Sequence, residues 1–342
     1  MKHDKESPGD TEHFHMTIGS NDEGRRVDRI LRKAFPGFSL SFIHQILRKK
    51  RVLVNGKPVK ADDRVIEGDG LSLKGPIAVP RKDTPCPEYP PLPKPDILYA
   101  GSGLLIVLKP AGLAVHGPDS LETRVNAYLQ DTLPASLSFK PGPLHRLDKP
   151  TSGIVAFSTS LDGAKRFSQA LREGTVKKYY LALMDGVIDT TETWEDHLYR
   201  DESIQKTLDA SLPGTPAGPA RQNGNGPERP GQRAVMTVRP LARNERYSLV
   251  WINLETGRTH QIRAQGAIHG HPLAGDKKYG GSFLAGGYLL HARAMAVPEE
   301  TAPDLPRLML APLPEGFEKT VIRIFGGKIK GILSEIPPSL RS

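Results

Sequence analysis

The apolar positions near the amino terminus predict two short helices. One helix is indicated by apolar residues at the i, i+3, i+4, i+7 spacing of a single buried face, at Val27, Ile30, Leu31 and Ala34. A second helix, which Ser39 can cap, has its apolar side chains at Phe42, Ile43, Ile46 and Leu47. It ends in four cations that suit the negative end of a helix dipole, namely Arg48, Lys49, Lys50 and Arg51.

Short strands are predicted to follow this helix pair. Val52 and Val54, two residues apart as on one face of a strand, lead into the tight-turn pair Asn55-Gly56, and Val59 follows. A further strand pair is expected around Val65 and at 71–73. Together, the helices and strands predict a small α+β module over residues 22–75.

From residue 96 onward the pattern changes to apolar strands. Strand-like runs occur at 104–108, 154–157, 179–184, 234–238 and 248–254. Helices are predicted at 163–172 and 258–269. Because few long crossover helices separate the strands, the pattern favours a mixed or antiparallel sheet over a doubly wound one. The expected fold class is α+β: a mixed, largely antiparallel sheet flanked by helices, plus the small amino-terminal α+β module.

These patterns divide the chain into a tail, two domains and a linker. Residues 1–21 show no sustained periodicity and are expected to form a disordered tail. Eight prolines make 76–95 a stiff linker, which predicts few contacts between the two domains. The larger domain is predicted over 96–330, with a disordered insertion at 210–232 and a second tail at 331–342.

Composition narrows the class of protein. The 342 residues include 37% hydrophobic and 25% charged positions, which is the composition of a soluble protein. No apolar run approaches the roughly 20 residues that span a bilayer, and the polar start MKHDKESPGD has the pattern of neither a signal nor a transit peptide. The single cysteine, Cys86, excludes an internal disulfide and a multi-cysteine metal site. The cytoplasm is the expected location, without a membrane partner.

The basic residues gather in the amino-terminal module. The net charge is +9, and residues 22–74 carry thirteen Lys or Arg against seven Asp or Glu, a surplus of six. A basic soluble protein needs no polyanionic partner, so net charge alone decides little. Two-thirds of the surplus within this short segment, however, is typical of a surface that binds a phosphate backbone.

Three separated segments carry candidate chemistry. In HRLDKPTSG (145–153) an aspartate lies on a short loop before a strand, where Arg146 and Lys149 can meet phosphates; alternatively, it is a turn aspartate paired with a cation. In KKYYLAL (177–183) strand alternation sends the two tyrosines to opposite faces, so that one can stack on a base while the other packs in the core. In ETGRTHQIR (255–263) two arginines open a helix and can neutralise a carboxylate and a phosphate, or simply be solvated.

Taken together and in this order, the three segments resemble the RluA-type pseudouridine synthase family. The stretches LKPAGLAVH (108–116), HPLAGDKKYG (271–280) and LLHA (289–292) match as well. The resemblance covers about residues 96–315 apart from the insertion, and it looks closest to the RluC-like branch that modifies large-subunit ribosomal RNA. In the amino-terminal module, SFIHQILRKKRVLVNGKPV and VIEGDGL resemble the RNA-binding domain named after ribosomal protein S-four.

The resemblance implies a role for individual residues. Asp148 corresponds to the essential aspartate, Tyr180 to the tyrosine that stacks on the base, and Arg263 to the arginine that pairs with the aspartate. Arg146 matches a residue implicated in displacing the target base from its helix. The expected RNA contacts are these and other cations: Arg146, Lys149, Lys178, Arg258, Lys109, Arg48, Lys49, Lys50 and Arg51. The chain departs from the family at 101–103 and at Leu108, outside the three segments.

The implied reaction moves uracil from its N1 linkage to a C5 linkage on the same ribose, so no cofactor is expected. One ionised carboxylate can act as the covalent nucleophile. Burial raises the pKa of a carboxylate, and a paired arginine opposes this by roughly 1–3 units; Arg263 is the candidate partner. Attack on ribose C1′ or on uracil C6 remains open. The expected partner is 23S ribosomal RNA or an assembly intermediate, and the protein is expected to be a monomer.

Three other hypotheses explain less of the sequence. A non-catalytic RNA-binding protein would share the basic module but would not need the aspartate, tyrosine and arginine motifs. A glycosidase-like hydrolase usually needs two carboxylates, and Glu255 is a weak second. A metal site from His260, His269, His271 and His291 is possible by count. These histidines lack HExxH spacing and cysteine partners, so a structural role is favoured and no metal is expected.

Overall fold

The computed structural model describes residues 12–75, 92–130, 132–133, 136–211 and 231–334. The chain forms two compact units. The first comprises residues 1–94, 124–142 and 158–164, and the second comprises 95–123, 143–157 and 165–342. No helix among the described residues is long and apolar enough to cross a membrane.

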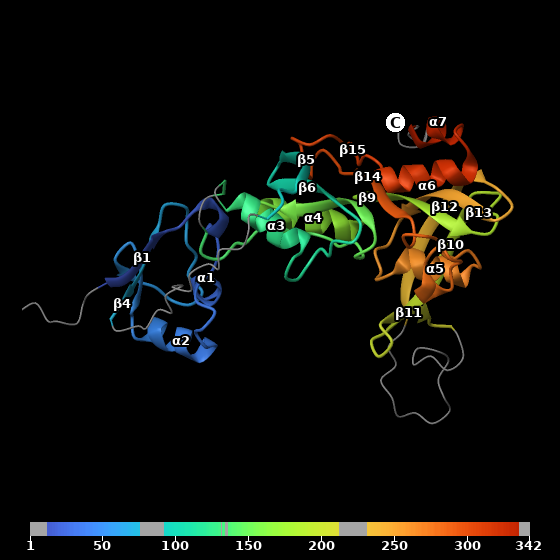
Figure 1. Ribbon diagram of the computed structural model, residues 1–342. Coiled ribbons are helices and arrows are strands. Elements are labelled where there is room, and N and C mark those ends of the chain that lie inside the picture. Colours follow the sequence, from blue (N-terminus) through green and yellow to red (C-terminus); the bar gives the residue numbers. More distant parts are fainter. Residues whose placement is uncertain (1–11, 76–91, 131, 134–135, 212–230, 335–342) are drawn as a thin grey trace, which may run out of the picture. The chain divides into compact units, whose positions relative to one another are not determined.

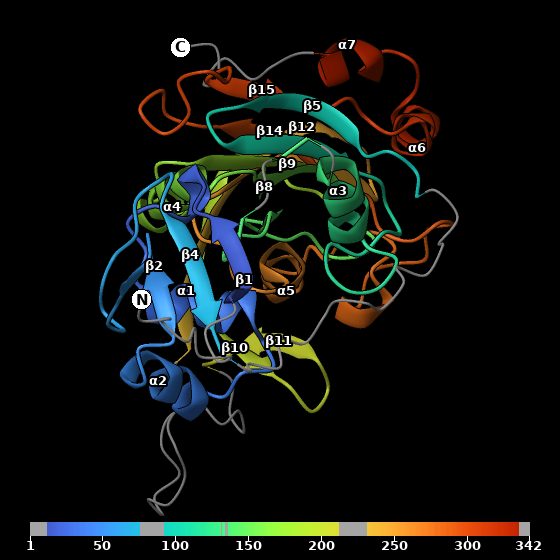
Figure 2. The same ribbon diagram turned by 90° about the vertical axis from the view of Figure 1, so that its left-hand side faces the viewer.

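The first unit holds the two predicted helices against a four-stranded antiparallel sheet. The helices are α1 (Val27–Ala34) and α2 (Leu40–Arg48), and Ser39 Oγ caps α2 by accepting from the amide of Phe42 at 3.2 Å. The sheet order is β1-β4-β2-β3, with β1 (Glu12–Thr17), β4 (Gly70–Lys74), β2 (Val52–Val54) and β3 (Lys57–Pro58). Figure 2 shows β1 beside β4.

Two expectations for this region are wrong. Residues 12–17 of the expected tail form strand β1, because their backbone pairs with β4, a partner more than 50 residues away in sequence; residues 1–11 lie outside the described residues. Val65 lies in no strand; its amide donates to the carbonyl of Arg25 at 3.2 Å, and β4 pairs with β1 and β2 instead. Both errors concern pairing partners, which local periodicity does not specify.

The first unit also includes later parts of the chain. The buried carboxylate of Asp22 accepts hydrogen bonds from Ser136 Oγ at 2.9 Å, Leu137 N at 2.8 Å and Ser138 N at 3.0 Å. Asn21 Oδ1 accepts from the amide of Leu161 at 3.0 Å. The prediction of few contacts across the proline-rich segment is therefore wrong, because Asn21 at the end of the expected tail and Asp22 at the start of the expected module both bind residues that follow that segment. Residues 76–91 lie outside the described residues.

The second unit is built on an eleven-stranded mixed sheet, which confirms the predicted fold class. Its order is β11-β10-β12-β13-β9-β14-β8-β6-β5, with β15 on β14 and β7 on β8. The strands are β5 (Asp96–Gly101), β6 (Leu104–Lys109), β7 (Gly142–Pro143), β8 (Ser152–Ser158), β9 (Lys177–Asp185), β10 (Glu192–Asp201), β11 (Lys206–Asp209), β12 (Gln232–Arg243), β13 (Tyr247–Leu254), β14 (Leu290–Ala296) and β15 (Leu308–Leu310). Neighbours from β10 to β14 pair antiparallel, whereas β8 and β14 are parallel.

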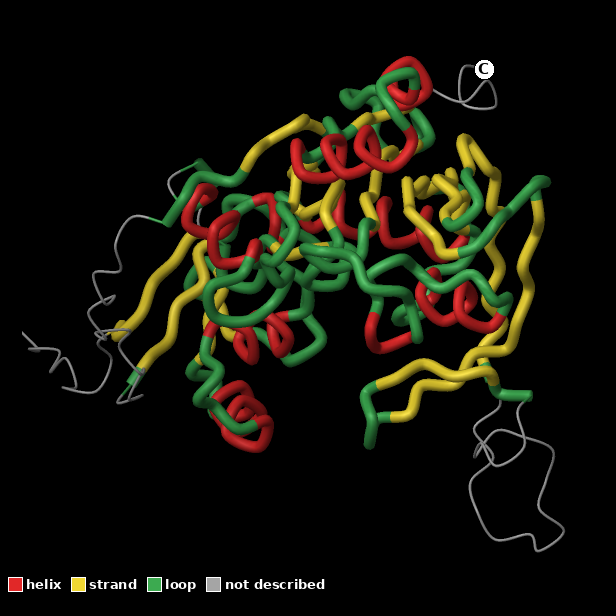
Figure 3. The backbone as a smooth tube through the Cα atoms, turned by 45° about the vertical axis from the view of Figure 1, so that its right-hand side comes forward, coloured by secondary structure: helices red, strands yellow, loops and turns green. Residues whose placement is uncertain are grey.

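Helices cover both faces of the central strands (Figures 1 and 3). The helices of this unit are most of α4 (Leu161–Glu173), α5 (Gln261–Ile268), α6 (Glu315–Phe325) and α7 (Ile329–Ser334), whereas α3 (Leu121–Leu129) lies mainly in the first unit. Phe317 and Val321 of α6 pack on Leu181 and Trp251 in one apolar cluster. Ala264 of α5 packs in a separate cluster. The strand positions that alternate with Leu181 and Trp251 therefore face away from α6 and are available to a site on the α5 side.

The boundaries of this unit differ from the predicted ones in three places. Helix α5 is shorter than the predicted 258–269 and starts three residues later. Helix α7 occupies residues 331–334 of the expected second tail, because Leu333 is buried in the cluster beneath α6; 335–342 lie outside the described residues. At the ends of the expected insertion, Ala210 is buried and β12 begins at Gln232, while 212–230 lie outside the described residues.

Candidate active site

Asp148 lies on the turn between β7 and β8. The amide of Thr151 donates to the carbonyl of Asp148 at 3.0 Å, which closes this turn immediately before the strand begins. Gly153 follows with a φ of 119°, and a Cβ there would lie 2.3 Å from the carbonyl oxygen of Ala292 in the parallel neighbour β14. The glycine therefore lets β8 approach β14 closely, and this packing fixes the turn that carries Asp148.

Arg263 reaches Asp148 from the first turn of α5, as the sequence predicts. Its Nη1 donates to Asp148 Oδ2 at 3.1 Å. The side chain of Arg263 is 9% exposed and that of Asp148 is 21% exposed, so the pair is shielded on the arginine side and open toward the pocket.

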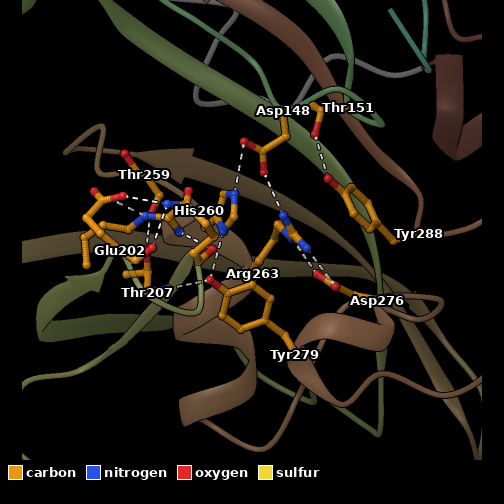
Figure 4. Close-up of polar contacts among 12 residues, drawn as sticks. Asp148, Thr151, Glu202, Thr207, Thr259, His260, Arg263, Asp276, Tyr279 and Tyr288 are labelled. Carbon is orange, nitrogen blue, oxygen red and sulfur yellow. Dashed lines mark hydrogen bonds and ion pairs between the residues drawn. The ribbon is translucent and has the colours of Figure 1, made fainter. Parts of the chain in front are cut away.

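The planar fork of Arg263 grips a different carboxylate, Asp276. Arg263 Nε lies 2.6 Å from Asp276 Oδ2, and Nη2 lies 2.9 Å from Asp276 Oδ1 (Figure 4). The guanidinium also lies over two rings, 4.9 Å from the centroids of both Tyr279 and Tyr288. Burial lowers the pKa of Arg263, but the Asp276 hydrogen bond and the charges of Tyr288, Asp276 and Asp148 raise it above its ordinary value. Arg263 is thus a permanent cation in a fixed orientation.

The residues that hold Arg263 were not singled out from the sequence. Asp276, Tyr279 and Tyr288 lie close together in sequence, and the only signal for the first two was the matching stretch HPLAGDKKYG. Aspartate and tyrosine in such a stretch are equally compatible with an ordinary turn. Their convergence on Arg263 depends on the path of the chain after α5, which local patterns do not reveal.

Tyr180 and Tyr179 point to opposite faces of β9, as predicted. Tyr180 is buried and lines the pocket that contains Asp148. Tyr179 stacks on Trp251 with 6.0 Å between ring centroids, in the cluster under α6. Burial raises the pKa of Tyr180, and the charge of Asp148 raises it further. The Tyr180 hydroxyl therefore keeps its proton at neutral pH and can donate a hydrogen bond.

These residues belong to the lining of one pocket, which contains both apolar and charged side chains. The lining side chains are Arg146, Leu147, Asp148, Thr151, Tyr180, Leu254, Arg258, His260, Gln261, Ile262, Arg263 and Leu290. A ring between apolar side chains, with charged groups at its edge, is the environment that suits a planar polar ligand such as a nucleobase.

His260 lies on the other side of Asp148 from Arg263. Its Nε2 is 3.7 Å from Asp148 Oδ1, and its Nδ1 is 2.9 Å from the hydroxyl oxygen of Tyr279. That oxygen also accepts from the amide of Thr207 at 2.9 Å. Burial lowers the pKa of His260 to about 4, with Asp148 opposing the shift, so the imidazole is neutral at pH 7. A Tyr279 hydroxyl that donates to Nδ1 leaves the imidazole proton on Nε2, facing Asp148.

The expected RNA contacts near the pocket fall into two groups. Arg146, Lys149 and Arg258 are exposed. Arg146 and Arg258 line the pocket, and Arg258 Nε donates to the carbonyl of Arg233 at 3.0 Å. Lys178 is half-buried, and burial lowers its pKa. Arg146 and Arg258 therefore place positive charge at the pocket.

Lys109 does not fit its expected role. Its side chain is 0% exposed, and its ammonium donates to the carbonyls of Leu113 at 2.6 Å, Pro110 at 3.0 Å and Lys149 at 3.0 Å. All three ammonium protons are thus used inside the protein. The prediction that Lys109 contacts RNA is wrong, because its side chain points inward onto backbone carbonyls, although residues 110–112 that follow it form an exposed turn.

The basic run after α2 lies on the surface of the first unit. Arg48, Lys49 and Lys50 are exposed, and Arg51 is half-buried. Arg48 lines a surface hollow together with His44 and Lys60. These cations are free to meet phosphates, and they belong to a different compact unit from the pocket.

The four histidines considered as metal ligands have separate partners. His260 faces Asp148, His269 Nε2 lies 3.0 Å from Asp196 Oδ2, His271 Nδ1 lies 3.0 Å from the carbonyl of Asp185, and His291 Nδ1 lies 2.8 Å from Ser152 Oγ. Within the described ranges, no three His, Cys, Asp or Glu residues are grouped so that they could hold a metal ion.

Comparison with known families matches both parts of the chain. The family described as RNA pseudouridylate synthase matches residues 103–267, and the S4 domain matches residues 25–71. A solved structure, human RNA pseudouridylate synthase domain containing 4, aligns with a TM-score of 0.54 at 23% identity, covering 67% of this chain and 92% of that one. This likeness shows that the fold is shared.

Two curated relatives are similar along most of this chain. Ribosomal large subunit pseudouridine synthase C of Escherichia coli K12 is 31% identical over 273 residues, which cover 78% of this chain and 79% of the relative. Ribosomal large subunit pseudouridine synthase D of Neisseria meningitidis serogroup A is 30% identical over 267 residues. The match covers 78% of this chain and 66% of that relative, so the chain spans about two thirds of its length.

Proposed function

Because the chain belongs to the RNA pseudouridylate synthase family, we propose that it isomerises uridine to pseudouridine in RNA, with Asp148 as the covalent nucleophile. One observation carries this proposal: a carboxylate, partly exposed to a pocket, is held at one oxygen by the buried cation Arg263. The aromatic ring of Tyr180 lines the same pocket as that carboxylate.

The reaction is balanced without an added oxidant or reductant. The N1–C1′ bond of uridine breaks, the uracil turns, and a C5–C1′ bond forms; C5 loses a proton and N1 gains one. Asp148 forms a transient bond to ribose C1′ or to uracil C6, which divides a difficult substitution into easier steps. The apolar side chains around it limit access of water, which would otherwise hydrolyse the intermediate.

Tyr180 is proposed to hold the uracil during its rotation. A ring that stacks on a base contributes roughly 1–3 kcal/mol and tolerates different orientations of that base. The protonated Tyr180 hydroxyl donates a hydrogen bond to a polar edge of the uracil or takes part in the proton exchange at C5. Its place on β9, a central strand with hydrogen-bonded neighbours on both sides, keeps this ring fixed while the base moves.

Large-subunit ribosomal RNA is the proposed substrate. The names of the two relatives support this choice, and so do the separate basic surface at 48–51 and the match to an RNA-binding domain. The target uracil must leave its stack, at a cost of a few kcal/mol. Arg146, exposed at the pocket, is proposed to occupy the space that the base vacates, while Lys149 and Arg258 hold nearby phosphates.

The division of labour follows the chain. Residues 22–75 are proposed to bind RNA, and 96–330 to carry the reaction. Asp148, Tyr180 and Arg263 all come from one chain, which supports action as a monomer. Since ribosomal RNA is the proposed substrate, the proposed location is the cytoplasm.

The test is release of tritium from RNA that carries [5-³H]uridine. The protein should release tritium and leave pseudouridine in the chain, and Asp148→Asn should lose activity while its RNA affinity stays within a few-fold. Free uracil in place of pseudouridine would identify a hydrolase. Binding without tritium release from any ribosomal RNA would identify a binding protein, and Asp148→Asn activity within tenfold of the parent would exclude the proposed nucleophile.

A further inference from the structure

Asp276 contacts Arg263 more extensively than the proposed nucleophile does. Asp276 takes two guanidinium nitrogens, at 2.6 and 2.9 Å, whereas Asp148 takes one, at 3.1 Å. Asp276 is 2% exposed and lies behind the arginine, away from the open side of the pocket, whose lining does not include it. From this geometry we infer that Asp276 is a positioning residue, which aims a single nitrogen of Arg263 at Asp148 and shares the arginine's charge.

The positioning begins with the turn that carries Asp276. Gly275 has a φ of 92°, and a Cβ there would lie 2.6 Å from the carbonyl carbon of Gly287. A Cβ on Gly281 would lie 2.0 Å from the carbonyl oxygen of Leu273. A side chain at either position would collide with this backbone, so glycine is needed at both for the turn to pack closely on the neighbouring segments. The Asp276 carboxylate is held further by the amide of Lys278, which donates to Oδ1 at 3.2 Å.

The two tyrosine rings leave the guanidinium little freedom to turn. Tyr279 and Tyr288 each place a ring centroid 4.9 Å from Arg263 Cζ. Their hydroxyls are held in turn, Tyr279 by the amide of Thr207 at 2.9 Å and Tyr288 near Thr151 Oγ1 at 3.4 Å. With Nε and Nη2 bound to Asp276, Nη1 is the nitrogen that remains to face Asp148 (Figure 4).

Sharing the charge has a chemical consequence. Two carboxylates face one guanidinium, so the group of three carries a net charge of −1. If Arg263 faced Asp148 alone, its whole charge would act on the nucleophile; a carboxylate gripped bidentately by arginine is stabilised in its ground state. Asp276 takes the bidentate contact instead, and the other Asp148 oxygen, Oδ1, lies 3.7 Å from Nε2 of the neutral His260.

This inference rests on the proposed role of Asp148 and makes a prediction about pH. Charged or titratable groups surround Asp148. They are Lys109 of β6, Tyr180 of β9, His260 and Arg263 at the start of α5, Tyr288 before β14, Asp276 behind the arginine, and Arg146 and Arg258 in the pocket lining. Asp276→Asn removes one negative charge from this set. With one negative charge fewer around the site, binding of a proton there becomes less favourable, so the acidic limb of the rate should move to lower pH.

The experiment compares Asp276→Asn and Asp276→Glu in the full chain, with single-turnover rates and RNA affinity measured from pH 4.5 to 8. Asp276→Asn should lower the rate about 10- to 100-fold, since small misplacements of catalytic groups cost this much, with RNA affinity within threefold and the acidic limb shifted downward. Asp276→Glu keeps the charge and displaces it by one methylene. It should lower the rate without moving the limb.

The matched control is Glu195→Gln. Glu195 and Arg233 form a bidentate pair with the same two distances, 2.6 and 2.9 Å, but both side chains are at least half exposed. This variant should keep the parental rate within twofold. If Asp276→Asn acts like the control, or loses rate with an unmoved limb, the inference is overturned. If Asp276→Asn does not fold, a folded Asp276→Glu with the parental rate overturns it. Activity in Asp148→Asn would instead overturn the proposed function.

Discussion

The ammonium group of Lys109 lies 3.0 Å from the carbonyl oxygen of Lys149, the residue directly after Asp148. The same ammonium donates to Leu113 and Pro110, and the amide of Gly112 donates to Lys149 O at 2.8 Å. Lys109 thus joins the turn that follows β6 to the turn that carries the proposed nucleophile. The sequence suggested a phosphate contact, whereas the structure assigns a buried cation that organises backbone.

We predict that the activity has an alkaline limb that depends on Lys109. Burial lowers the pKa of Lys109 to about 8, with the charge of Asp148 opposing the shift. Above that pH the neutral amine has two protons for three carbonyls, so the link between the turn after β6 and the Asp148 turn is weakened and the rate should fall. The measurement is the rate as a function of pH for the parent and for Lys109→Met. Titration of uridine itself affects the rate of both proteins, so only the parent should show the additional limb near pH 8.

The same group should change stability in the opposite direction. The folded pKa of Lys109, about 8, lies below its ordinary value of 10.5, so between these pH values the unfolded chain binds more protons. The contribution of Lys109 to the free energy of unfolding therefore rises with pH in that window and is lost as pH falls through 8. Denaturant unfolding at pH 7.5 and 10 should show this rise relative to Lys109→Met. Parallel loss of rate and stability above pH 8 would contradict the assignment.

The two neighbouring tyrosines of β9 should differ in their effect on catalysis. Tyr180→Phe keeps the stacking ring in the pocket but removes the hydroxyl, so the turnover rate should fall, by about 100-fold if that hydroxyl transfers a proton, with RNA affinity within threefold. Tyr179→Phe is the matched control, because Tyr179 packs against Trp251 on the opposite face and should change the rate less than twofold. Single-turnover kinetics and RNA binding measure both effects. Equal losses from the two changes would mean that the pocket face is misassigned.

The candidate site could be predicted where its residues sit in short local patterns. Asp148, Tyr180 and Arg263 each lie in a distinctive segment, and alternation along one strand was enough to separate Tyr179 from Tyr180. Asp276 could not be found in this way, because its role depends on a contact with Arg263, and that contact forms only when the chain turns back after α5. The burial of Lys109 could not be predicted either. A lysine beside proline and glycine is typical of a surface turn, and its three carbonyl partners come from the fold. Strand β1 was missed because its partner β4 comes more than 50 residues later.

Asp22 should stabilise the first unit through its contacts with residues 136–138. Asp22→Ala removes the carboxylate that accepts from Ser136, Leu137 and Ser138, and a buried donor that loses its partner costs about 1–3 kcal/mol. We expect the free energy of unfolding to fall by at least about 2 kcal/mol. We also expect faster hydrogen exchange at the amides of Leu137 and Ser138. The control is Asp62→Ala, at an exposed position. Unchanged exchange at 137 and 138 would contradict the packing of this unit.

The basic surface of the first unit should contribute phosphate contacts without taking part in the reaction. Deleting residues 22–75 would also remove Asp22 and expose its partners, so charge substitutions are the cleaner test. Arg48→Gln, Lys49→Gln and Lys50→Gln combined should weaken binding to ribosomal RNA. The slope of log affinity against log salt should fall by about 2–3, because three fewer cations release counterions. Turnover on a short RNA at saturating concentration should stay within twofold of the parent, since the pocket belongs to the other unit.

A charge-matched control separates this local effect from the loss of net charge. Arg323, Lys328 and Lys330 are exposed on and between α6 and α7, the helices on the face of the sheet away from Tyr180. Replacing these three by glutamine removes the same charge. If the 48–50 cluster holds RNA, its triple variant should lose affinity and salt dependence, while the control triple should change the slope by less than 1. Equal changes in both would show that the protein senses RNA through its overall charge, and that the cluster after α2 has another role.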